Sequence, residues 1–247
     1  MSDFSGLVNS VGDLVSSASR YIVEPSTKSC CHRAQKAQVQ KESIVSATFA
    51  THPRAIDRSS TDALFRDAHT GYVFEDTQVT DDQLAEIYDL VRFAPTALNA
   101  QPLRITFIRS AEAKARLLPL LAEPNRPKAQ SAPVVAILAA DTDFHEHLPR
   151  VLPQNPQAKS RFEDDAVRTD TALANANIQA GYFILAARAV GLDVGPMGGF
   201  DKAGVDAEFF AGTPLRSFMV VNLGYATPEG TFPRNPRLEH HEVVTTL

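Results

Sequence analysis

The segment Arg168–Val190 constrains the fold most strongly, because small and apolar residues recur along it with helical spacing. They are Ala172, Ala174, Ala176, Ala180, Gly181, Ala186, Ala187 and Ala189, with Ile178, Tyr182, Ile184 and Leu185 among them. A helix that is apolar around much of its circumference has to be buried on several sides. The segment therefore predicts either a central core helix or a helix that packs against a second subunit.

Helical and strand patterns alternate through residues 59–247, which predicts a single domain. Apolar residues at helical spacing predict further helices at Asp62–Ala68, Asp81–Phe93, Ala111–Ala122, Phe144–Pro149 and Lys202–Phe210. Short β-branched runs that end in charge or glycine predict strands at Arg104–Arg109, Pro133–Ala140 and Ser217–Tyr225. Because the predicted helices clearly outnumber the strands, the pattern indicates an α+β domain rather than a doubly wound sheet.

Residues 1–58 differ from the rest and predict an N-terminal extension. Apolar residues in Leu7–Ile22 recur at helical spacing, which predicts a short amphipathic helix. No period is sustained over Lys28–Arg58, and we expect disorder there. Asp3 and Asp13 argue against a targeting peptide. The remaining interpretations are a helix that docks on a partner or a membrane surface, and a dispensable tail.

Charge and cysteine usage exclude several classes of protein. The chain has 24 Lys and Arg against 29 Asp and Glu, and seven of the former and five of the latter fall in residues 1–58. The domain is therefore acidic, which argues against a general nucleic-acid binder. No apolar run of about 18 residues occurs, so we expect no membrane span. The two cysteines, Cys30 and Cys31, are adjacent, which favours a reducing cytoplasm and excludes iron–sulfur and zinc-thiolate sites.

The sequence has no G-x-G-x-x-G loop, no Walker loop and no G-x-S-x-G elbow. Two clusters, within Asp141–His147 and Glu239–Glu242, contain acidic residues and histidines that could bind a metal. The first follows a predicted strand and the second lies near the C-terminus. We therefore interpret both as solvated surface, with metal binding as the weaker alternative.

Three segments allow a ligand to approach the backbone closely. Ala94–Pro102 forms a turn between a predicted helix and a strand, and Gly195–Asp201 contains two successive glycines without side-chain bulk. Pro233–Leu238 contains two arginines in an acidic domain, which predicts an anion clamp. Taken singly, the alternatives are an ordinary loop, a linker and a surface pair.

Together and in this order, these segments resemble the nitroreductase family of FMN-dependent oxidoreductases, from about Asp62 to the C-terminus. The run Gly191–Asp201, followed by Asp206–Phe210, is the most specific part of the likeness. It is similar above all to the branch that contains malonic semialdehyde reductase. The resemblance implies that residues 59–247 form an FMN-binding, nitroreductase-like domain with a central sheet flanked by helices. It also implies a homodimer in which both subunits contact each flavin.

The resemblance assigns roles in binding FMN to particular residues. Asn125 and Lys128 reach the pyrimidine end of the isoalloxazine ring, where a cation stabilises the negative charge of the reduced flavin. The backbone N–H groups of Gly198 and Gly199 face N5 and O4, and Arg237, with Arg234, holds the phosphate. The other implied ligands are His69, Thr70, Gly71, Pro196 and Met197, with Pro95, Thr96, Ala97 and Asn99 along one side of the flavin.

One position departs from the family pattern. His69 stands where the family usually has an arginine that binds the phosphate, so a permanent charge is replaced by a group that is largely neutral at pH 7. Arg66 or Arg234 could compensate. Without such compensation, FMN loading is expected to fall as the pH rises from about 6 to 8, because the histidine loses its charge in this range.

The implied reaction transfers hydride from NADH or NADPH through flavin N5 to a small acceptor, so no side-chain nucleophile is required. The branch favours a semialdehyde such as malonic semialdehyde, reduced to 3-hydroxypropanoate, with Arg104 or Arg126 meeting its carboxylate. The alternatives are a broad nitroaromatic or quinone reductase, a non-catalytic flavin-binding protein and a protein-interaction domain.

Overall fold

The computed structural model describes residues 55–247. The predicted amphipathic helix and the two cysteines lie outside these residues. Helix α2 (Arg58–Thr61) begins one residue before the predicted start of the domain, because the Asp57 carboxylate caps it and accepts a hydrogen bond from the Ser60 N–H at 2.8 Å. The expectation of disorder is therefore wrong at Arg58.

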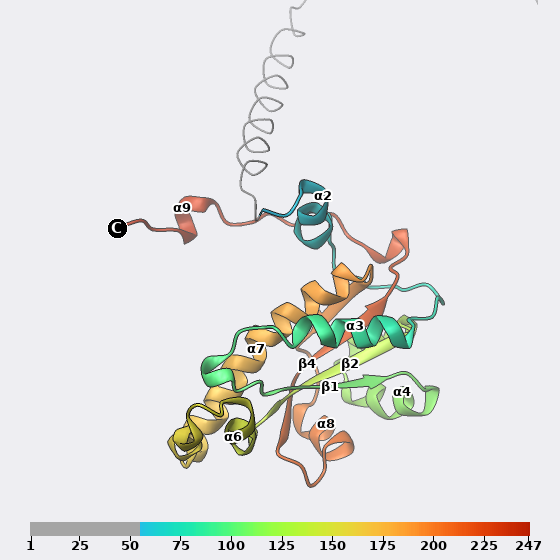
Figure 1. The fold of residues 1–247 in the computed structure, drawn as a ribbon. Coiled ribbons are helices and arrows are strands. Elements are labelled where there is room, and N and C mark those ends of the chain that lie inside the picture. The colour runs from blue at the N-terminus through green and yellow to red at the C-terminus, as the bar shows by residue number, and fades with distance from the viewer. Residues whose placement is uncertain (1–54) are drawn as a thin grey trace, which may run out of the picture. The chain divides into compact units, whose positions relative to one another are not determined.

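Four antiparallel strands form one sheet with the order β1-β2-β4-β3 (Figure 1). Three of them lie within two residues of the predicted bounds: β1 (Leu103–Ile108), β2 (Val134–Asp141) and β4 (Leu215–Gly224). Strand β1 pairs with β2 from Leu103 opposite Ala140 to Ile108 opposite Val135. The α+β architecture with a central sheet is confirmed.

The fourth strand, β3 (Asp193–Met197), is missing from the sequence prediction, which treated residues 195–201 as a loop. That prediction is wrong for residues 195–197. Gly195 and Pro196 are poor strand formers, but β3 is an edge strand that pairs only with β4 inside the sheet. An edge strand tolerates proline, because the missing N–H can face away from the ladder.

Most predicted helices are present with shifted ends. The described helices beyond α2 are α3 (Asp81–Val91), α4 (Ala111–Leu117), α5 (Arg126–Ser131), α6 (Leu148–Val151), α7 (Asp165–Ala189), α8 (Lys202–Phe209) and α9 (His240–Val243). Helix α4 ends five residues before the predicted bound, since Pro119 cannot continue it and a 3₁₀ turn follows. A single π-helical turn, Asp62–Arg66, replaces the first predicted helix. Helix α5, with Pro127 in its first turn, went unpredicted.

Helices cover both faces of the sheet (Figure 1). Every residue of β2 is buried, and its side chains alternate between two apolar clusters. Val134, Ala136 and Leu138 pack with residues of α3 and α7. The intervening Val135 and Ile137 pack with residues of α4, α5 and α8 on the other face. The result is a three-layer core with β2 at its centre.

Helix α7 is the central helix that the small residues predict. Ala180, Ala186 and Ala187 are buried in the cluster that includes β2, so the helix backbone approaches the sheet closely, whereas Ala174, Gly181 and Ala189 are exposed. Two buried amides on α7 also fix the neighbouring chain: Gln179 Oε1 accepts from the Leu103 N–H at 3.0 Å, and Asn175 Oδ1 accepts from the Ala97 N–H at 2.7 Å. Helix α7 therefore positions both the start of β1 and the loop before it.

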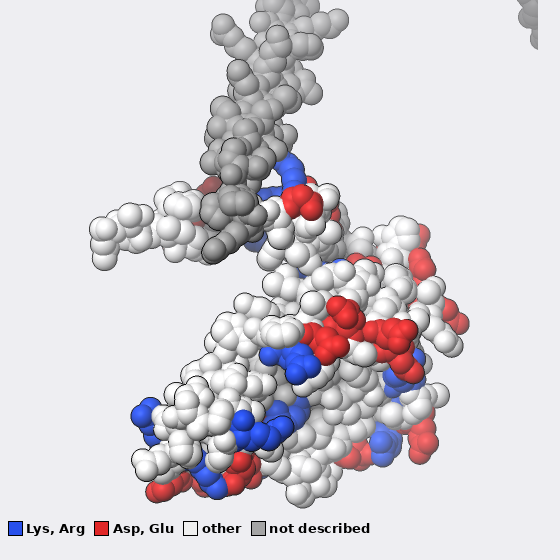
Figure 2. Space-filling view, in the orientation of Figure 1, with Lys and Arg blue, Asp and Glu red and all other residues white. Residues whose placement is uncertain are grey.

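The surface is mainly acidic over α3 (Figure 2). Asp81, Asp82, Glu86 and Asp89 all lie on this helix, and the first two stand in its first turn, where the helix dipole favours negative charge. None of the helices in residues 55–247 is long and apolar enough to cross a membrane.

Substitution of Gly195 tests how closely β3 is covered. An added Cβ would lie 2.6 Å from the Gly71 carbonyl oxygen, so Gly195→Ala is expected to lower the free energy of unfolding by about 1–3 kcal/mol. Gly198→Ala is the matched control, because its Cβ would meet no atom within 4 Å, and a change within about 0.5 kcal/mol is expected. Urea unfolding of the apoprotein measures both; equal stabilities would contradict the predicted clash.

Candidate functional site

Two pockets adjoin each other at the segment 70–72. One, of about 180 Å³, is lined by His69, Arg188, Arg234 and Arg237, and we call it the basic pocket. The other, of about 240 Å³, is the glycine pocket, lined by Gly71, Asn125, Lys128, Pro196, Met197 and Gly198 among others. Thr70 and Tyr72 line both. Ten of the fifteen residues expected to bind FMN therefore lie in one continuous region.

Backbone hydrogen bonds hold the segment 70–72 in place. The Gly71 N–H donates to the Val194 carbonyl at 3.0 Å, and the Tyr72 N–H donates to the Gly230 carbonyl at 2.8 Å. Thr70 and Val194 form an isolated parallel bridge. The segment thus lies along the free edge of β3. This strand, which the sequence did not predict, therefore positions the residues that line both pockets.

In the glycine pocket, Asn125 links Lys128 to the chain that follows β3. Asn125 Nδ2 donates to the Gly199 carbonyl at 3.0 Å, and Lys128 Nζ donates to Asn125 Oδ1 at 3.1 Å. The Lys128 ammonium also lies 4.6 Å from the centroid of the Tyr72 ring, within cation–π range. These contacts fix a positive charge beside Gly198.

Gly198 leaves room for a ligand. A Cβ at this residue would meet no atom within 4 Å. Among the hydrogen bonds in residues 55–247, none has the Gly198 or Gly199 N–H as its donor. Both residues are exposed. The backbone after β3 therefore offers two donors to an approaching group.

In the basic pocket, the C-terminal chain packs against the segment that follows α2. Arg234 Nη2 donates to the carbonyls of Arg66 and Ala68 at 2.6 and 2.8 Å, and His69 Nδ1 lies 3.1 Å from the Phe232 carbonyl oxygen. Arg237 Nη1 donates to the Asn235 carbonyl at 2.8 Å. These contacts bring Arg234 and His69 together across more than 160 residues of sequence.

Arg66, one of the two residues expected to compensate for His69, does not line the basic pocket. Its Nη1 contacts the Asp62 carboxylate at 2.5 Å and the Thr61 hydroxyl at 3.0 Å. The hydrogen bond from Arg66 lowers the pKa of the Asp62 carboxyl. Arg188 lines the pocket instead, and sequence reasoning missed it, because its only signal was a basic residue in the last turn of a helix.

The loop Pro95–Asn99 lies outside both pockets. Ala97 is held by Asn175 of α7, and Asn99 Nδ2 donates to the Val151 carbonyl at 2.8 Å. Leu98, Asn99 and Gln101 have φ angles of 53°, 51° and 45°, a left-handed conformation that non-glycine residues adopt only when contacts impose it. Asn175 and Arg188 are thirteen residues apart on α7, so the loop and the basic pocket are about 20 Å apart along this helix.

The two arginines expected to meet an acceptor carboxylate are engaged elsewhere. Arg104 Nη2 pairs with Asp141 Oδ2 at 2.5 Å, and its Nη1 donates to the carbonyls of Gln101 and Leu103. Arg126 Nε donates to the Leu121 carbonyl at 3.0 Å, and its Nη2 donates to that of Pro119. Both guanidinium groups hold loops in place.

The metal alternative finds no support among the described residues, where no group of three or more His, Cys, Asp or Glu gathers around one point. Asp141, from the first cluster, is buried and paired with Arg104, with His147 Nε2 at 3.6 Å. A cavity of about 530 Å³ lies nearby, bordered by Tyr88, Arg92 and Phe107, but of the residues assigned roles by the resemblance it contains only Arg104.

Comparison with known proteins identifies the family. The family model described as "Nitroreductase family" matches residues 66–225. A relative from Streptomyces coelicolor, named as an NADH dehydrogenase/NAD(P)H nitroreductase, is 53% identical over 183 residues, which cover 74% of this chain and 91% of the relative. A protein of the same name from Leptothrix cholodnii is 50% identical over 194 residues, covering 78% and 98%.

Solved structures agree with the fold. A nitroreductase from Bacillus subtilis matches with a TM-score of 0.68 at 22% identity, over 76% of this chain and 99% of that one. A nitroreductase from Exiguobacterium sibiricum, solved in complex with FMN, also has a TM-score of 0.68, at 20% identity, over 74% and 95%. Because the family model matches residues 66–225 and the relatives from Streptomyces coelicolor and Leptothrix cholodnii are 53% and 50% identical, the chain belongs to the nitroreductase family.

Proposed function

We propose that this chain is an NAD(P)H-dependent oxidoreductase that uses FMN. The observation that carries the proposal is the adjacency of the basic pocket and the glycine pocket, which share Thr70 and Tyr72. FMN combines a phosphate dianion with a flat ring. The basic pocket offers positive charge for the phosphate, and the glycine pocket offers space beside the backbone for the ring. The named relatives and the FMN-bound fold neighbour support this cofactor.

The basic pocket fits the phosphate. Arg234 and Arg237 supply guanidinium groups, and Thr70 lines the pocket with a hydroxyl donor. Both arginines use only Nη atoms for their hydrogen bonds to backbone carbonyls, so further donors remain on each. The expected dependence of FMN loading on pH stays a prediction.

The glycine pocket fits the ring. When bound, FMN supplies two-electron transfer between NAD(P)H and the acceptor. The Gly198 and Gly199 N–H groups would donate to the bound ring, and Lys128 would stabilise the negative charge that reduction places on it. Asn125 orients Lys128 through the hydrogen bond between them. The chain contributes orientation and charge, with no side-chain nucleophile.

The acceptor that we propose is a nitroaromatic compound or a quinone. Relatives at about half identity are named NAD(P)H nitroreductases, which supports this class. A semialdehyde, favoured by the branch resemblance, is the second candidate. Arg104 and Arg126, which were expected to bind its carboxylate, are instead held by backbone carbonyls and Asp141. A cytoplasmic location belongs to the same proposal.

We further propose a homodimer in which each FMN contacts the loop Pro95–Asn99 of one chain and both pockets of the other. The separation of about 20 Å along α7 supports this arrangement, since one chain alone keeps the two sets apart. Ile178 and Tyr182 lie one turn apart on α7 and are 47% and 42% exposed, which suits a subunit interface.

The visible spectrum and anaerobic reduction test the cofactor and the reaction. We expect the purified protein to be yellow, to be bleached by NADH or NADPH, and to be reoxidised by nitrofurazone or a benzoquinone faster than by malonic semialdehyde. Faster reoxidation by malonic semialdehyde would make the semialdehyde the first candidate acceptor in place of a nitroaromatic compound or a quinone. A flavin that neither nicotinamide bleaches would indicate the non-catalytic alternative, and a colourless protein that ignores added FMN would refute the proposal.

Gly198→Val tests the ring site. The valine side chain would enter space that is free in the protein, so apoprotein stability is expected to change little, while the Kd for FMN rises by at least about tenfold through the clash. Ala85→Val, on the exposed face of α3, introduces the same side chain and should leave Kd unchanged. Fluorescence titration of FMN measures both; an unchanged Kd in Gly198→Val would contradict this site.

Mixing two defective chains tests the shared site. Ala97→Trp fills the loop side and Gly198→Val fills the pocket side, so each homodimer should bind FMN weakly. Co-refolding equal amounts should restore binding in about one quarter of the sites, because half of the dimers are mixed and each has one intact site. Sites built within one chain would show no recovery.

A further inference from the structure

Arg188 is a residue of the basic pocket that the sequence did not predict. It lies in the last turn of α7 and lines the pocket with Arg234, Arg237 and His69. Its Nη1 donates to the Leu64 carbonyl at 2.8 Å, which anchors the side chain. Its Nε is fully buried and has no hydrogen-bond partner. Arg168 Nε is likewise buried without a hydrogen-bond partner, so what distinguishes Arg188 is its place in the lining of the basic pocket.

The charge around Arg188 is unbalanced. Among the ion pairs of residues 55–247, none includes Arg188, Arg234 or Arg237. Burial lowers the pKa of the Arg188 guanidinium below its ordinary value, the positive charge of Arg234 lowers it further, and Asp193 opposes both. Three guanidinium groups around one small pocket therefore repel one another unless an anion binds between them.

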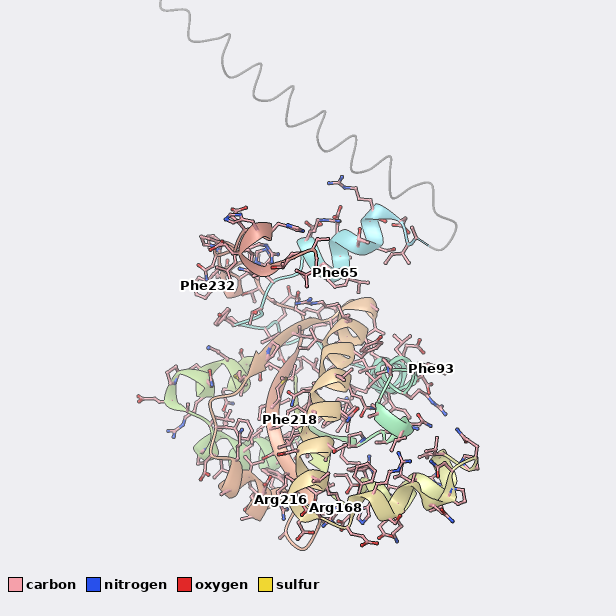
Figure 3. The ribbon with its side chains drawn as sticks, turned by 90° about the vertical axis from the view of Figure 1, so that its left-hand side faces the viewer. Phe65, Phe93, Arg168, Arg216, Phe218 and Phe232 are labelled. Carbon is pink, nitrogen blue, oxygen red and sulfur yellow. The ribbon has the colours of Figure 1, made fainter. Side chains whose placement is uncertain are left out.

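Arg168, at the other end of the same helix, is an arginine whose positive charge is offset by neighbouring carboxylates. Its Nη2 contacts Asp165 at 2.5 Å and its Nε lies 3.7 Å from Asp143 Oδ1. Figure 3 places Arg168 at the lower end of α7, far from Phe232, which lines the basic pocket at the top. Arg168 forms ion pairs with two carboxylates, whereas Arg188 forms none and has the positive charge of Arg234 nearby, with Asp193 opposing it.

We infer that Arg188 is a specificity-determining residue for the cofactor, binding the phosphate of FMN and thereby selecting FMN over riboflavin. The inference rests on the proposed use of FMN. His69 brings no permanent charge and Arg66 is engaged with Asp62, so Arg188 is the third permanent cation available in the pocket. With Nη1 anchored and Nε fully buried, Nη2 is the donor left for a phosphate oxygen.

The test compares two ligands that differ only in the phosphate. Kd values for FMN and riboflavin are measured by fluorescence titration of the full-length apoprotein, for the unmodified chain, Arg188→Gln and Arg188→Lys. Arg188→Gln is expected to weaken FMN binding by about 10- to 100-fold and riboflavin binding by less than about twofold. Arg188→Lys, which keeps the charge, should recover part of the loss.

Arg168→Gln is the matched control, since it removes a half-buried arginine from the same helix, and its ratio of riboflavin to FMN Kd should equal that of the unmodified chain. An equal loss for both flavins in Arg188→Gln would overturn the inference and indicate that Arg188 only anchors the segment near Leu64. An unmodified chain that binds neither flavin would overturn the proposed function, and this assignment with it.

Discussion

Close packing of α7 against the sheet is the interaction on which the rest of the structure depends. Small side chains on the buried face of α7 let the helix approach β2, whose residues are all buried. The amides of Asn175 and Gln179 are buried at this contact and satisfy the N–H groups of Ala97 and Leu103. One helix therefore fixes the strained loop near its middle and carries Arg188 into the basic pocket at its end.

Electrostatics sets the basic pocket apart from the domain around it. Most cations elsewhere are offset by neighbours, as Arg104 is by Asp141 and Arg168 by Asp165. The hydrogen-bond acceptors of Arg234 and Arg188 are backbone carbonyls of Arg66, Ala68 and Leu64, which orient the guanidinium groups without neutralising them. A concentration of positive charge without ion pairs in an acidic protein favours an anionic ligand, in keeping with the phosphate site that we propose.

Much of the fold and part of the site could be predicted from local sequence. Strong periodicity located α3, α7 and α8, and β-branched runs located β1, β2 and β4, because these elements present one or two apolar faces to the core. The failures have local causes. Gly195 and Pro196 hid β3, since edge pairing overrides strand propensity, and α5 is too short to show a helical period.

The sequence by itself determined the α+β class, the family likeness and the glycine and basic segments, because these depend on residue types at short spacing. Only the tertiary structure decided that Arg188, and not Arg66, lines the basic pocket, that Arg104 and Arg126 are engaged by backbone carbonyls, and that the loop 95–99 lies far from the pockets. The physical reason is that the direction of a side chain and its partners follow from how α7, β3 and the C-terminal segment pack, and these contacts join residues more than 100 positions apart.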